Sequence, residues 1–64
     1  MSLQSIHLYD HESREVYYRD GRVERVPEEV IRDVAPGREV DVVASWAKRT
    51  RRIGETDEIA TIAG

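Results

Sequence analysis

The dipeptide Asp20-Gly21 separates two runs of β-forming residues, and this pattern constrains the fold more than any other feature of the sequence. A type I′ turn needs a positive φ angle at both central positions, and Asp-Gly is one of the dipeptides that adopt it most readily. Residues 14–19 and 22–26 therefore predict the two strands of a β-hairpin. We also expect a positive φ angle at Gly21.

Residues 3–9 predict a strand that precedes the hairpin, because their apolar and polar side chains alternate with a period of two. Ile6 and Leu8 fall on one face of this strand, and His7 and Tyr9 fall on the other. The face of Ile6 and Leu8 is the more apolar one. We therefore expect Tyr9 on the polar face.

The second half of the chain predicts one short helix and two further strands. Proline suits the first position of a helix, so a helix is expected over about 27–35. Residues 38–46 alternate more regularly than any other segment and predict a strand. Residues 58–63 fit either a strand or one helical turn, and we favour the strand. The basic residues 47–52 between them predict a loop or a hairpin tip. The expected inward face of the 38–46 strand carries Val40, Val42, Ala44 and Trp46.

The predicted order is β-β-β-α-β-β, an α+β fold in one small domain that spans residues 1–64. Its core is thin, because Leu, Ile and Val provide only 15 of the 64 residues and no cysteine is present to form a disulfide. A partner subunit is the remaining means of stabilising so small a core. We therefore expect a homo-oligomer, with the homodimer as the commonest form.

The sequence also predicts where the protein resides. Its N-terminus lacks the basic start and the apolar run of a signal peptide, and no segment approaches the roughly 18 apolar residues of a membrane span. The absence of cysteine fits a reducing compartment. We expect a soluble cytoplasmic protein that makes no membrane contact.

The sequence carries no motif of a stand-alone enzyme, and we expect neither enzyme activity nor a cofactor. It has no phosphate-binding glycine loop and no cysteine nucleophile, and so short a chain has little volume for a pocket of about 300 Å³ or more. His7 and His11, with Asp10 and Glu12, form a cluster of metal-ligating residue types. A strand followed by a turn does not bring the two imidazoles onto one face, so we expect no metal site.

The most suggestive group of side chains follows Trp46. Residues 46–53 contain four basic residues and no acidic residue, although the net charge of the chain is −3. Arginine and lysine neutralise phosphates, and an aromatic ring can stack on a base. Trp46 continues the expected inward face, however, and we predict that it is buried. The predicted nucleic-acid contacts are Arg22, Arg25, Lys48, Arg49, Arg51 and Arg52.

Tyr9 and Tyr17 provide a second candidate surface. They lie on adjacent predicted strands, on the polar face of each. They fit either a cross-strand pair that covers the sheet or a patch that binds a partner protein, since tyrosine is enriched at interfaces.

Residues 21–43 resemble the core of AbrB/MazE-type swapped-hairpin proteins. The shared pattern is a Gly-Arg-Val strand (residues 21–23), a proline that opens a short helix (Pro27), and a Pro-Gly-x-x-Val turn into the next strand (residues 36–40). The resemblance implies an intertwined homodimer that binds DNA through a β-rich face with basic residues. It also implies a role as a transcription regulator or an antitoxin.

These features lead to two hypotheses about function. The first is a small homodimeric regulator that contacts nucleic acid through a basic hairpin. The second is a protein-binding adaptor or inhibitor that offers an edge strand or a Tyr/Arg surface to a larger protein. Binding to DNA or RNA that weakens with salt separates them, because counterion release is the signature of phosphate contacts.

Overall fold

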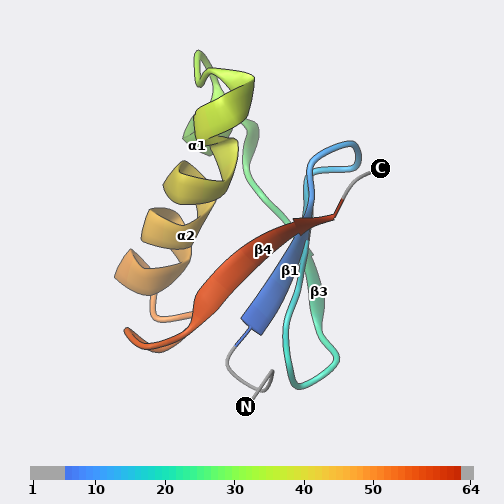
Figure 1. Ribbon diagram of the computed structural model, residues 1–64, viewed down its shortest axis with the longest axis vertical. Helices are drawn as coiled ribbons and strands as arrows, with labels where there is room; N and C mark the ends of the chain where they lie inside the picture. The colour runs from blue at the N-terminus through green and yellow to red at the C-terminus, as the bar shows by residue number, and fades with distance from the viewer. Residues whose placement is uncertain (1–5, 63–64) are drawn as a thin grey trace.

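The computed structural model describes residues 6–62, in which a four-stranded mixed sheet carries its helices on one face (Figure 1). Strands β1 (Ile6–Asp10), β2 (Glu15–Tyr17) and β3 (Val23–Arg25) form an antiparallel meander. Strand β4 (Glu58–Ile62) returns parallel to β1, so the strand order is β3-β2-β1-β4. The α+β class, the three N-terminal strands and the C-terminal strand are therefore confirmed. Residues 3–5 of the first predicted strand and residue 63 of the last one lie outside the described residues.

The helix predicted over 27–35 is much shorter than expected. Helix α1 covers only Glu28–Ile31, and the chain becomes extended directly after it. Asp33 then adopts a φ of 63°, and Ala35 is extended because the ring of the following proline disfavours the helical region. A 3₁₀ turn, η1 (Pro36–Arg38), leads into the next helix.

The segment predicted as a strand over 38–46 is a helix, α2 (Glu39–Arg49), so this prediction was wrong. Its buried side chains are Val43, Trp46 and Ala47. These positions are three and four residues apart, which is the spacing of one helical face. The apolar side chains of this segment therefore fit a helical period as well as the period of two.

Charges at the two ends of the segment favour the helical period over the period of two. Glu39 and Asp41 lie in the first turn of α2, and Lys48 and Arg49 lie in the last turn. Acidic side chains near the N-terminus and basic side chains near the C-terminus stabilise a helix through its dipole. A strand gains nothing from this arrangement.

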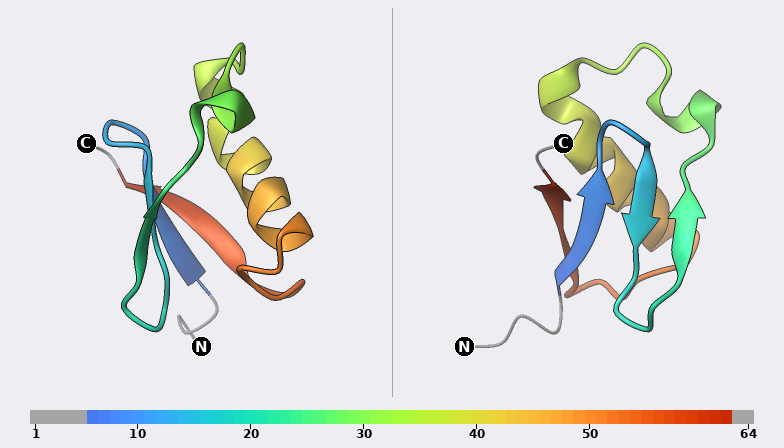
Figure 2. Two further views of the ribbon diagram at one scale, coloured as in Figure 1. Left: turned by 180° about the vertical axis from the view of Figure 1, so that it is seen from behind. Right: turned by 90° about the vertical axis from the view of Figure 1, so that its right-hand side faces the viewer.

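Helix α2 covers one face of the sheet, which we call the inner face, and the core lies between them. The right-hand view of Figure 2 looks onto the uncovered outer face, with the helices behind the strands. Trp46 is 6% exposed, so its predicted burial is confirmed, although it reaches the core from a helix. The core consists of Tyr9, Val16, Tyr18, Val26, Ile31, Val43, Trp46, Ala47 and Ile53.

The buried face of β1 is the opposite of the one expected. Tyr9 is fully buried, and its hydroxyl donates a hydrogen bond to Glu39 Oε1 at 2.9 Å. Leu8 is 43% exposed on the outer face. The assignment of Tyr9 to a polar surface was therefore wrong, because α2 packs against the face that holds the two polar rings, His7 and Tyr9.

Neither helix in residues 6–62 combines the length and apolar character that crossing a membrane requires.

Candidate functional site

The turn between β2 and β3 forms one wall of the candidate site. The Tyr18 carbonyl accepts a hydrogen bond from the Gly21 N–H at 3.0 Å, and the Tyr18 N–H donates to the Arg22 carbonyl at 2.8 Å. Gly21 has a φ of 95°, as predicted. Asp20 does not have a positive φ, so the turn is a three-residue loop closed by a left-handed glycine rather than a type I′ turn.

The end of α2 and the loop after it form the facing wall. The Arg52 N–H donates to the Ala47 carbonyl at 2.8 Å, and the Arg51 N–H donates to the Lys48 carbonyl at 3.1 Å. These two bonds make a Schellman motif, in which the residue just past the helix is left-handed and is usually glycine. Here that residue is Arg51, with a φ of 61°. The basic run at 47–52 is therefore a helix end and its cap, not the predicted hairpin tip.

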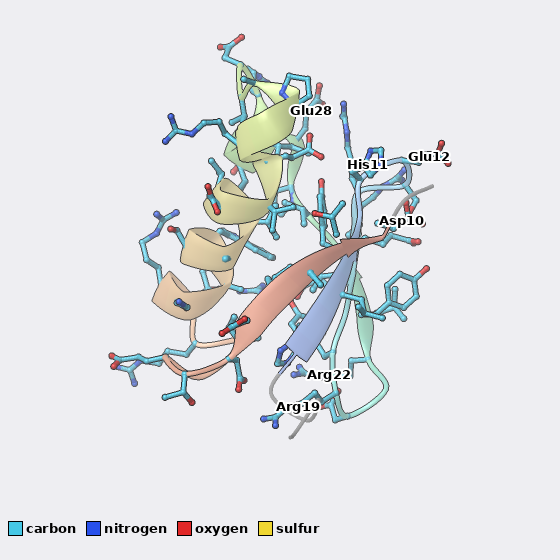
Figure 3. All side chains as sticks on the ribbon, in the orientation of Figure 1. Asp10, His11, Glu12, Arg19, Arg22 and Glu28 are labelled. Atoms are coloured by element: carbon cyan, nitrogen blue, oxygen red, sulfur yellow. The ribbon has the colours of Figure 1, made fainter. Side chains whose placement is uncertain are left out.

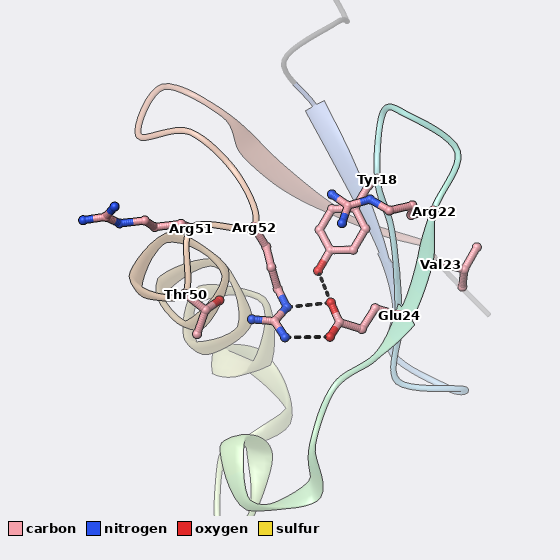
Figure 4. A pocket seen from close by; sticks show the side chains of 7 residues that line it. All are labelled: Tyr18, Arg22, Val23, Glu24, Thr50, Arg51 and Arg52. Carbon is pink, nitrogen blue, oxygen red and sulfur yellow. Dashed lines mark hydrogen bonds and ion pairs between the residues drawn. The ribbon is translucent and has the colours of Figure 1, made fainter.

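Glu24 joins the two walls, as Figure 4 shows. Its carboxylate accepts two hydrogen bonds from Arg52, at 2.6 and 2.8 Å, and one from the Tyr18 hydroxyl at 2.8 Å. The Arg52 guanidinium also lies over the Trp46 ring, 4.5 Å from its centroid. The hydrogen bonds from Arg52 hold the pKa of Glu24 below its usual range, so Glu24 is a stable anion in this network.

Two adjacent clefts open between these walls. The Glu24 cleft has a volume of about 550 Å³ and lies over Tyr18, Glu24 and Arg52. The His7 cleft has a volume of about 360 Å³ and reaches back to His7 and Asp57. Both exceed the room expected of so short a chain, because they form at the surface between two loops rather than inside the core. The two clefts share Tyr18, Arg22, Arg51 and Arg52.

His7 and Asp57 are the buried polar side chains at the back of the His7 cleft, at 4% and 6% exposed. His7 Nδ1 lies 3.9 Å from Asp57 Oδ2 and has no hydrogen-bond partner. Asp57 Oδ2 accepts from the Gly54 N–H at 3.1 Å and lies 3.5 Å from Arg19 Nη2. The His7 and Tyr18 rings contact each other edge to face, with 5.6 Å between their centroids. Burial lowers the pKa of His7, and the Asp57 carboxylate opposes this effect.

The structure brings five of the six predicted nucleic-acid contacts to this end of the molecule. Arg22 and Arg52 line both clefts but already have acidic partners, since Arg22 Nε lies 2.7 Å from Asp20 Oδ2 and Arg52 binds Glu24. Arg51 also lines both clefts, and Lys48 and Arg49 are exposed on the last turn of α2 beside them. The sixth, Arg25, is different. It lies at the far end of β3 beside Glu15.

Four further residues belong to the site, although no sequence pattern marks them as its members: Arg19, His7, Glu24 and Asp57. His7 and Asp57 are 50 positions apart and meet only because β4 returns beside β1. Figure 3 shows Arg19 and Arg22 at the end of the sheet opposite to His11 in the β1–β2 turn. His7 lies near the start of β1 and His11 follows its end, so the two histidines do not form the cluster that their spacing in the sequence suggests. Within residues 6–62, no three His, Asp or Glu side chains are close enough to hold a metal ion.

The two tyrosines predicted to bind a partner lie on opposite faces of the sheet. Tyr9 belongs to the core, whereas Tyr17 is 37% exposed on the outer face. Tyr17 pairs with Leu8 on one side and Val23 on the other, and Leu8 pairs with Ala60. These four residues form one apolar row across all four strands, which we call the outer row.

Comparisons with protein-family models, with curated proteins and with solved structures found no match for this chain. The resemblance of residues 21–43 to AbrB/MazE-type proteins therefore remains a prediction.

Arg51 occupies a position where glycine is energetically preferred, and this generates a testable prediction. We expect Arg51→Gly to increase the free energy of unfolding by about 0.5–1 kcal/mol, because glycine adopts a left-handed helix cap without strain. Urea denaturation followed by Trp46 fluorescence measures the change. Arg14→Gly is the matched control, since Arg14 has the same φ of 61° in the β1–β2 turn. A loss of stability in Arg51→Gly alone would contradict the assigned cap.

Proposed function

We propose that this chain is a binding module that contacts the phosphate backbone of nucleic acid with its basic end. The basic end comprises the β2–β3 turn, the last turn of α2 and the loop that follows it. The observation that carries the proposal is the convergence of arginines from two segments about 30 positions apart on one pair of clefts. In this proposal the chain has no enzyme activity of its own.

The unpaired cations of the basic end support phosphate contacts. Within residues 6–62, Lys48, Arg49 and Arg51 take part in no ion pair and are exposed. Arginine presents donors in a fork that matches two phosphate oxygens, so an exposed arginine without an acidic partner is suited to this contact. Three such cations imply about three neutralised phosphates.

The aromatic rings of the basic end argue for backbone contacts rather than base stacking. Trp46 and Tyr18 are each 6% exposed, and arginine side chains cover their rings. A base therefore has no free aromatic face to stack on at these two positions. The proposal accordingly predicts binding with little sequence preference, since phosphate contacts carry no base information.

The biological role and assembly belong to the same proposal. A homodimeric regulator of transcription in the cytoplasm is the role that phosphate binding and the AbrB/MazE-type resemblance together suggest. Pairing two basic ends in one dimer would double the number of phosphate contacts and steepen the salt dependence.

The proposal predicts salt-dependent binding of a mixed-sequence DNA or RNA duplex. With about three phosphates neutralised, affinity should fall about 40-fold per protomer between about 50 and 200 mM salt, because released counterions oppose binding. Fluorescence anisotropy with a labelled duplex measures this slope. Arg51→Gly should reduce the fall to about 12-fold, because one phosphate contact is lost.

Arg14→Gly is again the control, since it changes the same residue type at the same φ in the remote β1–β2 turn. It should leave the affinity and the salt slope unchanged. Equal effects of the two variants, or binding that does not respond to salt, would reject the basic end as the contact surface.

A second candidate function is protein binding through the outer row. Leu8, Tyr17 and Val23 are 43%, 37% and 52% exposed, and all three lie in this single row. Apolar side chains scattered singly over a surface need no explanation, but a contiguous row fits a contact surface. The first partner to test is a second copy of the chain, because the thin core favours a homodimer.

The self-association candidate predicts a dimer at micromolar concentration that depends on the outer row. Sedimentation should give a dimer of the 7.4 kDa chain, and Leu8→Lys should convert it to a folded monomer, because a charge then replaces apolar contact area. Ser45→Lys, on the exposed part of α2, should remain a dimer. A wild-type monomer whose thermal melt does not change on dilution would exclude this candidate.

A further inference from the structure

The back of the His7 cleft holds a histidine whose ring nitrogen lacks a partner. His7 is more than nine-tenths buried, and Nδ1 makes no hydrogen bond although Asp57 Oδ2 is 3.9 Å away. A buried polar atom without a partner costs free energy, so such an atom needs an explanation. A proton on Nδ1 would make this nitrogen a hydrogen-bond donor. A movement of the His7 ring by less than 1 Å would then complete a hydrogen bond to Asp57.

The charges around His7 nearly cancel when its ring is neutral. Of the four arginines that line the His7 cleft, three face an acidic partner: Arg19 faces Asp57, Arg22 faces Asp20 and Arg52 faces Glu24.

Arg51 is the cation that remains. A proton on His7 would therefore raise the net charge of this group of side chains from about +1 to about +2. Because Asp57 then has the imidazolium as a partner, Arg19 is released to face the cleft. Arg19 holds Asp57 through a long contact of 3.5 Å, so its release costs little.

We propose that the His7 cleft binds a tetrahedral oxyanion, such as a phosphoryl group, and that protonation of His7 strengthens this binding. The released Arg19 would contact the anion, and so would Arg51 after its side chain, which points away from Glu24 in Figure 4, turns toward the cleft. The charged and titratable groups that face His7 are Asp57, Arg19 and Asp20, and the Tyr18 ring packs against it. A volume of about 360 Å³ is ample for such an anion.

For its natural ligand, this inference rests on the proposed function. Nucleic acid would supply the phosphoryl group, and the smaller His7 cleft suits a chain end, whereas the larger Glu24 cleft suits the continuous backbone. The anion site itself can be tested without nucleic acid. Failure of the two proposals can therefore be told apart.

Sulfate is the probe for the site, because it keeps its double negative charge throughout the pH range in which a histidine titrates. Burial lowers the pKa of His7, so the ring is neutral at pH about 7.5 and gains its proton as the pH falls. Sulfate should bind about tenfold more tightly at pH about 5 than at pH about 7.5, as followed by NMR of the Arg19, Arg51 and Gly54 amides. The binding of sulfate and of the proton on His7 affect each other equally. Saturating sulfate should therefore raise the pKa of His7 in the wild-type protein by an amount that corresponds to the ratio of the two sulfate affinities.

His7→Gln should bind sulfate with equal, weak affinity at both pH values, since a neutral amide cannot gain the charge. His11→Gln is the matched control and should behave as the wild type, because His11 is exposed in the remote β1–β2 turn. The pKa of His7 is measured in the wild-type protein, so this readout does not depend on whether a variant folds. Sulfate affinity that is the same at both pH values, or a pKa of His7 that sulfate leaves unmoved, would overturn the proposal.

A competition experiment separates the two sources of the phosphoryl group. Displacement of sulfate by a 5′-phosphorylated oligonucleotide, but not by its 5′-hydroxyl form, supports binding of a nucleic-acid end. Displacement by inorganic phosphate alone supports a site for a free anion. Displacement by neither overturns the site. If sulfate binds as expected but no duplex binding is found, the anion site stands and the proposed nucleic-acid function fails.

Discussion

The hydrogen-bonded pair of Glu24 and Arg52 is the interaction on which the arrangement of this end of the molecule depends. It joins β3 to the cap of α2 across 28 positions of sequence. Both side chains are about one-third exposed, at 31% and 35%, so the pair contributes about 1 kcal/mol or less to stability. Its main effect is positional, because it fixes the Arg52 guanidinium over Trp46 and sets the separation of the two walls that enclose the clefts.

Two groups of basic side chains can be distinguished at this end of the molecule. Arg22 and Arg52 are held by acidic partners and by aromatic rings, so they shape the clefts. Lys48, Arg49 and Arg51 project without such partners. A net charge of −3 is therefore compatible with a local surface that attracts phosphate, because the acids that outnumber the bases lie mostly on other parts of the chain.

The sequence predicts the meander and the C-terminal strand well and the helical segment between them poorly. The Asp20-Gly21 signal and the alternation around Val16 act within a few residues, so local chemistry determines them. The segment that became α2 has valines whose spacing suits both a strand and a helix. Only the tertiary contact of Val43 and Ala47 with the sheet, together with the end charges, makes the helix the stable choice.

The site is harder to foresee than the fold because it consists of contacts between distant segments. The basic run was visible in the sequence, but its acidic partners were not. His7 and Asp57 become neighbours through the parallel pairing of β1 with β4, which no local pattern encodes. Tyr9 illustrates the same limit, since the alternation of its strand predicted a polar face, whereas α2 covers this face and supplies Glu39 as the partner of its hydroxyl.

The most direct test of the central claim is an NMR map of amide shifts as a mixed-sequence duplex is added at low salt. We expect the largest changes to occur together in two segments, Arg19–Arg22 and Lys48–Gly54, because both contribute to the same pair of clefts. The β1–β2 turn should not respond. Changes confined to the outer row, or changes in one of the two segments without the other, would contradict the claim that the two segments form one nucleic-acid site.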